Sequence, residues 1–213
     1  MKRTIFLTFI LVFALSTSVA LGGDHNVQRV PAGAVAFHWV GNLTFPGPLP
    51  ELVGYIAFIE GVQGDLFSGD PGVGTAYFTV RLDSGPPPDA FPLPTADPGE
   101  VFALFISPGF TFGVYFNEIP NQDWNLFDTF SDGERVATFE ESAFLGTTIV
   151  SAGMAYNLFS SRLISSKSFW FNGQKVDFKK LVPNGVTINN VTSQDPNASA
   201  FTASAVAIGE RGR

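Results

Sequence analysis

The sequence has no cysteine and only two histidines, and these two scarcities exclude several kinds of chemistry. Without Cys there is no disulfide bond, thiolate metal site, iron–sulfur cluster or cysteine nucleophile. A zinc site built from histidines is nearly excluded, because only His25 and His38 are available. No Gly-x-Ser-x-Gly motif accompanies His38, so the sequence does not support a Ser–His–Asp triad. Carboxylates are therefore the next candidates for acid–base chemistry.

Basic residues are also scarce over most of the chain. From Val30 to Ser161 the only bases are Arg81 and Arg135, against fifteen Asp and Glu, whereas the tail from Arg162 has seven Lys and Arg against three acids. An acidic surface of this kind favours solubility. Because phosphate contacts need clustered Lys or Arg, we expect no nucleic-acid partner.

Long hydrophobic runs are missing after residue 20, and the one before it has the features of a signal peptide. Lys2 and Arg3 precede an apolar run over 4–15, and the small residues Ser18 and Ala20 suit a cleavage site after Ala20. The run is too short to span ~30 Å of hydrocarbon comfortably. We therefore expect a secreted protein, extracellular or periplasmic, with no transmembrane segment in its mature chain. Cleavage leaves 213 − 20 = 193 residues with a net charge of −7 − 2 = −9, which suits one domain.

Phenylalanine is abundant, with 23 copies, and we interpret most of them as core residues. Short apolar runs alternate with Gly, Pro, Asn and Asp, which is typical of all-β domains. We predict a loose leader over 21–32 and one all-β domain over 33–213. The expected architecture is a single antiparallel β-sandwich of about ten or eleven strands, with a β-barrel as the alternative.

Turn signals divide the domain into its expected strands. Asn172-Gly173 predicts a type I′ hairpin, because both central residues of that turn need positive φ. Six prolines between residues 83 and 100 keep that stretch out of the middle of a sheet. The expected strands are 34–41, 52–59, 74–82, 101–107, 110–117, 135–141, 147–159, 168–171, 174–178, 186–191 and 200–208.

Carboxylates come in two groups that could carry chemistry. Glu140 and Glu141 are adjacent in an expected strand, so their side chains point to opposite faces unless the strand ends there. The sequence favours a strand end with both carboxylates hydrated. The stretch 118–132 is crowded with acids and amides and also suits Ca²⁺, although ordinary Asx turns explain it without a metal. We therefore predict no cofactor.

The best candidate for ligand binding in the sequence is Trp124. It lies between Asp123 and Asn125, and a flat ring with hydrogen-bonding neighbours suits a sugar platform. The alternative is a Trp that plugs the end of the fold. Together with Glu118 and Tyr115, these residues form the predicted ligand-binding set.

Three functions remain open. The first is a non-catalytic binding module for a glycan or another small extracellular ligand. The second is an enzyme (hydrolase, isomerase or cyclase) that uses carboxylates inside an aromatic-lined barrel, and it requires a buried Glu or Asp. The third is a self-assembling surface protein, favoured by the strand 169–171, which is apolar on both sides. Three sequons, at Asn42, Asn190 and Asn197, matter only for a eukaryotic source. The sequence leaves the organism type and the oligomeric state open.

Overall fold

The computed structural model describes residues 26–44, 50–83, 89–93, 100–106, 110–149, 153–193 and 199–209, and the predicted signal peptide lies outside them. These residues form twelve strands and three short helical segments. The strands are β1 (Val35–Thr44), β2 (Glu51–Ile59), β3 (Phe78–Leu82), β4 (Asp89–Leu93), β5 (Glu100–Ile106), β6 (Thr111–Phe116), β7 (Glu134–Ile149), β8 (Met154–Ser166), β9 (Phe169–Phe171), β10 (Gln174–Val176), β11 (Val186–Ser193) and β12 (Ser199–Ala207). The helical segments are η1 (Val73–Thr75), η2 (Phe127–Ser131) and α1 (Phe178–Leu181).

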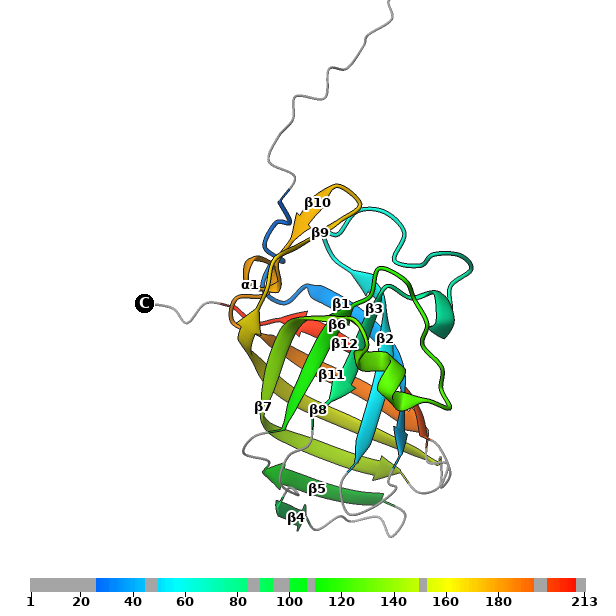
Figure 1. Cartoon of the computed structure of the whole chain (residues 1–213). Coiled ribbons are helices and arrows are strands. Elements are labelled where there is room, and N and C mark those ends of the chain that lie inside the picture. The colour runs from blue at the N-terminus through cyan, green and yellow to red at the C-terminus, as the bar shows by residue number, and fades with distance from the viewer. Residues whose placement is uncertain are drawn as a thin grey trace, which may run out of the picture.

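Eight of the strands close into an antiparallel barrel (Figure 1). The order β7-β6-β3-β2-β1-β12-β11-β8 returns to its start, because β8 also pairs with β7. The all-β prediction is therefore confirmed. Of the two architectures considered, the barrel forms, and the sandwich that we placed first is wrong. Closure leaves these eight strands without the two long free edges that each sheet of a sandwich must protect.

The long strand β7 makes this closure work. One of its edges pairs with β6 over Glu134–Glu140 and with β5 over Phe144–Ile149, while the other edge pairs with β8. The β4–β5 pair therefore extends one end of the barrel (Figure 1). Pro92 lies in β4, at the edge of the sheet, where its missing amide donor is tolerated.

The prediction of one continuous strand over 147–159 is wrong. The structure instead ends β7 at Ile149 and begins β8 at Met154, with Gly153 at φ 61° between them. Apolar residues flank this turn on both sides, so the sequence pattern predicted one continuous strand. The separately expected strand 135–141 therefore continues through 149.

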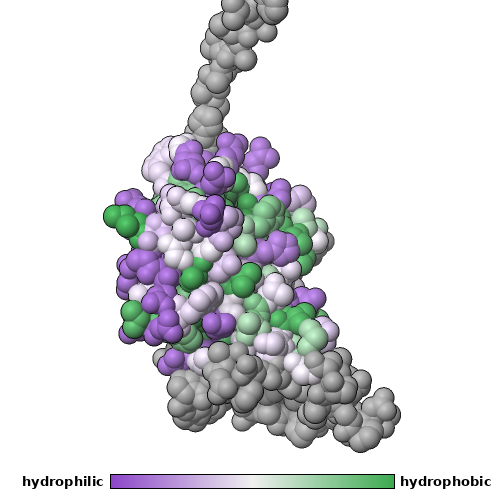
Figure 2. Space-filling model, turned by 90° about the vertical axis from the view of Figure 1, so that its right-hand side faces the viewer, coloured by the Kyte–Doolittle hydropathy of each residue, from purple (hydrophilic) through white to green (hydrophobic). Residues whose placement is uncertain are grey.

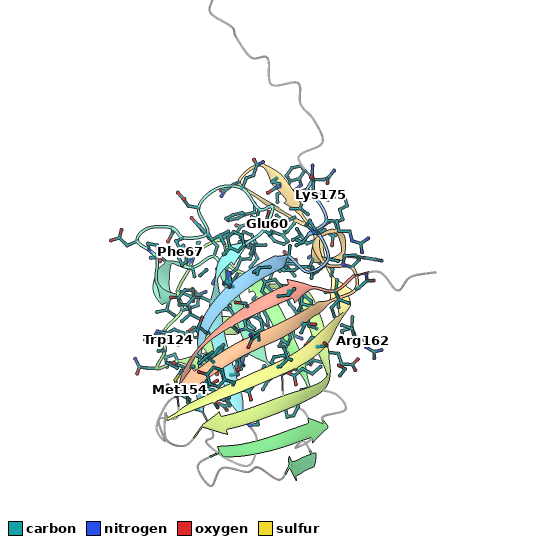
Figure 3. The ribbon with its side chains drawn as sticks, turned by 180° about the vertical axis from the view of Figure 1, so that it is seen from behind. Glu60, Phe67, Trp124, Met154, Arg162 and Lys175 are labelled. Atoms are coloured by element: carbon teal, nitrogen blue, oxygen red, sulfur yellow. The ribbon has the colours of Figure 1, made fainter. Side chains whose placement is uncertain are left out.

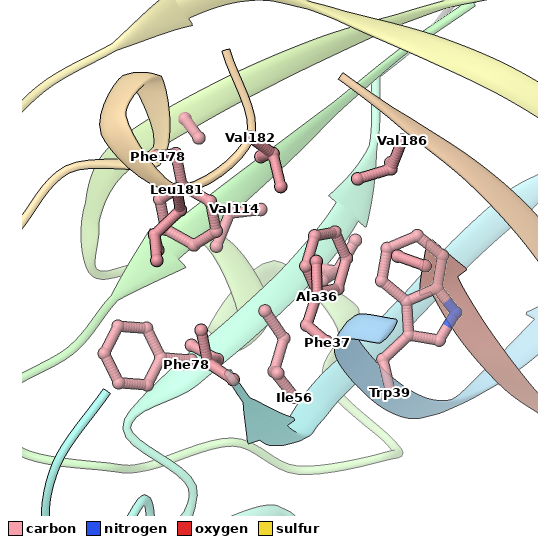
Figure 4. Close-up of a cluster of buried hydrophobic side chains, with 14 of the residues drawn as sticks. Ala36, Phe37, Trp39, Ile56, Phe78, Val114, Phe178, Leu181, Val182 and Val186 are labelled. Carbon is pink, nitrogen blue, oxygen red and sulfur yellow. The ribbon is translucent and has the colours of Figure 1, made fainter. Parts of the chain in front are cut away.

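The described interior of the barrel carries mainly aromatic and aliphatic side chains (Figure 4). Phe37 on β1 packs against Phe178 of α1 at a ring-centroid distance of 6.3 Å, and Phe78 packs against Phe171 of β9 at 5.0 Å. The helix α1 and the β9–β10 hairpin thus close one end of the barrel (Figure 1). Most described phenylalanines are buried, as expected for a core.

Part of the predicted loose leader belongs to the folded domain. The Val27 amide donates to the Lys175 carbonyl at 3.1 Å, and the Val30 amide donates to the Leu181 carbonyl at 3.0 Å. Both valines are buried against the plugged end. Residues 26–32 therefore help to cover that end.

The β9–β10 hairpin confirms the predicted turn. Asn172 has φ 49° and Gly173 has φ 75°, the positive values that a type I′ turn requires. Phe169 and Phe171 are buried, whereas Trp170 on the other side is 66% exposed. The hairpin is therefore covered on one face only. Among the described residues, no helix is long and apolar enough to cross a membrane.

Candidate functional site

The adjacent carboxylates on β7 point to opposite sides of the barrel wall. Glu140 forms an ion pair with Arg162, a side chain that is 72% exposed and points away from the barrel (Figure 3). Glu141 alternates with it, on the interior face that also carries the fully buried Phe139. The strand does not end at Glu141, so the expectation that both carboxylates are hydrated is wrong.

Glu141 lies beside uncharged neighbours. Its backbone amide donates to the Phe110 carbonyl at 2.8 Å, and its register partner on β8 is Ser161. Burial disfavours the charged carboxylate and raises the pKa of Glu141 to about 7. No ion pair to Glu141 forms within the described parts of the chain. Glu141 is therefore a carboxyl that changes charge near neutral pH.

Ser161 is the second unusual group at this place. It is fully buried, and within the described structure its Oγ has no hydrogen-bond partner. Residues directly opposite on antiparallel strands have Cβ atoms about 4.5–5.5 Å apart. The Ser161 hydroxyl is therefore close to the base of the Glu141 side chain. A buried hydroxyl without a partner is uncommon and calls for a physical reason.

Further polar groups line the same interior. Asn157 on β8 donates from Nδ2 to Oδ1 of Asn190 on β11 at 2.8 Å. Asn190 is buried, so this sequon is not accessible for glycosylation, whereas Asn42 pairs with Val53 on the outer face. Asn197 lies outside the described residues. Trp39 is buried in the interior, and its Nε1 has no hydrogen-bond partner in the described structure.

Aromatic rings line the same interior. Phe112 and Phe139 stack with a ring-centroid distance of 5.0 Å and an interplanar angle of 9°. Trp39 meets Phe112 edge-on at 5.3 Å, and the Phe201 ring lies so close to Gly41 that a Cβ there would collide with it. The interior is thus an apolar setting with a few isolated hydrogen-bonding groups, the composition typical of small-molecule sites.

Trp124 lies on the outside of the barrel (Figure 3). Its ring contacts Tyr55 at 6.1 Å and Phe130 at 5.1 Å, measured between ring centroids. The Thr79 hydroxyl donates to the Phe130 carbonyl at 2.7 Å and ties this segment to β3. Trp124 is therefore a half-buried member of an aromatic cluster that covers β2 and β3.

The other predicted ligand-binding residues are only partly gathered around Trp124. Asp123 Oδ1 accepts from the backbone amide and from Nδ2 of Asn125, both at 2.9 Å, as in an Asx turn. Glu118 is exposed. Tyr115 belongs to a different contact, since Arg135 donates to its hydroxyl and lies over its ring at 5.0 Å. Ligand binding by this set stays a prediction.

The face that carries this segment is chemically mixed. Figure 2 shows hydrophobic and hydrophilic residues interspersed over its described part, without one continuous apolar patch. Gln122 is buried beneath the segment, and neither its Nε2 nor its Oε1 has a hydrogen-bond partner in the described structure. No group of three or more acidic or histidine side chains suited to a metal ion was found among the described residues.

His38 lies on the outer wall, opposite in direction to Phe37 and Trp39, as the alternation of β1 predicts. Its Nδ1 is 2.9 Å from the Ser204 Oγ, and its ring contacts Phe58 at 5.7 Å between centroids. A hydroxyl on a convex wall, with no carboxylate bonded to the other ring nitrogen in the described contacts, does not make a catalytic triad.

By its architecture the protein is a closed antiparallel β-barrel, and among its described interior side chains it has a single carboxyl, that of Glu141. Comparison of the chain with models of protein families, with characterised proteins and with solved structures found no match. Function must then be argued from the site itself.

Proposed function

We propose that the protein binds a small, largely apolar molecule inside the barrel and that Glu141 is the polar group that orients this ligand. One observation carries the proposal: a carboxyl without an ion-pair partner in the described structure faces an interior of aromatic rings. Burying an ionisable group costs stability unless something compensates for it. Perturbed carboxyls of this kind gather at functional sites.

The architecture supports an interior ligand. Barrels of eight strands have an interior that side chains just fill or that holds one small molecule. Ser161 and Glu141 lie opposite each other in the β7–β8 register, so one bound group could satisfy both the Ser161 hydroxyl and the Glu141 carboxyl. A signal peptide over 1–20 would place this binding outside the cytoplasm, and we propose a secreted binding protein.

The first experiment combines binding with a footprint. N-phenyl-1-naphthylamine is an uncharged aromatic probe whose fluorescence rises on entering an apolar site. A diazoacetamide reagent esterifies protonated carboxyls, and at pH 6.5 Glu141 is largely protonated because its pKa is about 7. We expect bound probe to slow esterification of Glu141 about tenfold, as measured by peptide mass spectrometry.

Two internal references sharpen this footprint. Glu118 is exposed on the outer segment, and its labelling should not respond to the probe. The Trp124→Ala variant changes the outer aromatic cluster and should leave probe binding unchanged. A probe that fails to bind the wild type, or that binds without protecting Glu141, would contradict the interior site. Loss of binding in Trp124→Ala would move the site to the predicted outer set.

A second candidate function is proton transfer, such as that of an isomerase or a cyclase. The specific observation is the pKa of Glu141, about 7, which lies near the operating pH where a general acid–base works best. A single group can take a proton from one carbon and return it to another. Retaining and inverting glycosidases instead need two carboxylates.

Deuterium exchange at the α-carbon of cyclohexanone tests this candidate with a simple apolar carbon acid. The ionised carboxylate is the base, so the exchange rate should rise with pH up to about 7 and then level off. NMR measures the rate, and Glu141→Gln should reduce it to the uncatalysed level. A rate unchanged by this substitution would leave binding alone as the function.

A further inference from the structure

We infer that the ligand is a cation: a small apolar amine whose ammonium group pairs with Glu141 inside the barrel. The inference rests on the proposed interior site and adds the chemical class of the molecule that fills it. Three observations support it: the positions of the chain's own bases, the aromatic lining, and the unpartnered hydroxyl of Ser161.

No Lys or Arg among the described residues supplies a counter-ion for Glu141. Between residues 26 and 209 every Lys and Arg falls within the described ranges, so each can be located. Arg81 is paired with Asp128 and Arg135 with Asp83, both on the outer surface. The remaining bases, Arg29, Arg162, Lys167, Lys175, Lys179 and Lys180, are exposed.

Among the described side chains, the elements packed against Glu141 contribute no further charged group to the interior. Phe110 precedes β6, Ser161 lies opposite on β8, and Val186 pairs with Ser161 from β11. Arg162, next to Ser161, points outward to Glu140. The negative charge that Glu141 gains on ionisation is therefore left for a ligand to balance.

The remaining lining suits a cation. The faces of phenyl rings carry negative electrostatic potential and attract ammonium groups within about 6 Å of the ring centroid. Phe139 lies two residues before Glu141 on β7, so both side chains point to the same interior face. Phe112 stacks on Phe139 at this face. An ammonium group also carries three N–H donors, and the Ser161 Oγ is an acceptor with no partner in the described structure. A carboxylate, aromatic faces and a hydroxyl together form a site for a positive charge.

Three naphthalene derivatives of similar size test the inference: 1-naphthylmethylamine, 1-naphthalenemethanol and 1-naphthoate. They carry a positive charge, no charge and a negative charge, and each can be titrated as a competitor of N-phenyl-1-naphthylamine. At pH 8 Glu141 is ionised, and we expect the amine to bind about tenfold more tightly than the alcohol, with the carboxylate weakest. At pH 5.5 Glu141 is protonated while the amine keeps its charge, so the preference should disappear.

Two matched variants locate the preference. Glu141→Gln removes the interior charge, and we expect it to bind the amine and the alcohol equally at both pH values. Glu140→Gln makes the same chemical change at the neighbouring carboxylate, which points outward, and it should keep the tenfold preference for the amine over the alcohol at pH 8.

The possible failures are distinguishable. If the probe binds but the alcohol competes as well as the amine at pH 8, the ligand is not a cation, although the interior site stands. A preference for the amine that survives Glu141→Gln would also overturn the inference. If neither the probe nor any of the three ligands binds, the proposed function fails together with it.

Discussion

Replacing Phe178 by Ala is expected to lower the free energy of unfolding by about 4 kcal/mol, because large-to-small substitutions of a buried Phe cost roughly 3–5 kcal/mol. The ring is fully buried at the plugged end of the barrel and contacts Phe37 and Phe139, each at a ring-centroid distance of 6.3 Å. The loss includes the transfer of the ring out of water and the cavity that it leaves. Urea unfolding followed by circular dichroism measures the change.

The neighbour Lys179 provides the control for this prediction. It lies on the same short helix but is exposed, so Lys179→Ala should change the free energy of unfolding by less than about 0.5 kcal/mol. A helix of four residues has little stability of its own, and here Asp177 caps it by accepting from the Lys179 amide at 2.8 Å. If Phe178→Ala costs less than 1 kcal/mol, α1 is not the plug of the barrel.

Local patterns were enough to predict the fold class but not the closure of the barrel. The alternation of β1, with Phe37 and Trp39 opposite His38, and the turn at Asn172-Gly173 are properties of neighbouring residues, and both are present in the structure. Closure depends on the pairing of β7 with β8 and on the return of β8 to β11. The second of these pairings joins residues far apart in sequence, and alternation is the same in a sandwich and in a barrel.

The candidate site illustrates the same limit. Alternation alone shows that Glu140 and Glu141 face opposite sides of a strand, but not whether the strand continues beyond them. It continues because Phe144–Ile149 find partners on β5 as well as on β8. Ser161 offered no signal, since an isolated serine in a strand is common on an outer face. The packing of Trp124 against Tyr55 also joins distant segments that no local pattern connects.

Glu141→Gln is expected to change how stability depends on pH, with an effect of about 3 kcal/mol. The pKa of Glu141 is about 7 in the folded protein, against an ordinary value of 4.5. Between these two pH values the folded state binds more protons than the unfolded state, so wild-type stability at this site falls as pH rises from about 4.5 to 7. One unit of pKa corresponds to about 1.4 kcal/mol, and the total is therefore about 3 kcal/mol.

The variant has no such titration, because a glutamine amide is uncharged at every pH. Wild type and Glu141→Gln should therefore be similarly stable at pH 4.5, whereas the variant should be more stable by about 3 kcal/mol at pH 8. Urea unfolding at pH 4.5, 6 and 8 measures the difference, with Glu140→Gln as the variant that should show no such divergence. A Glu141→Gln protein less stable than wild type at pH 8 would mean that a partner already balances the Glu141 charge. In that case the barrel would not need a ligand to do so.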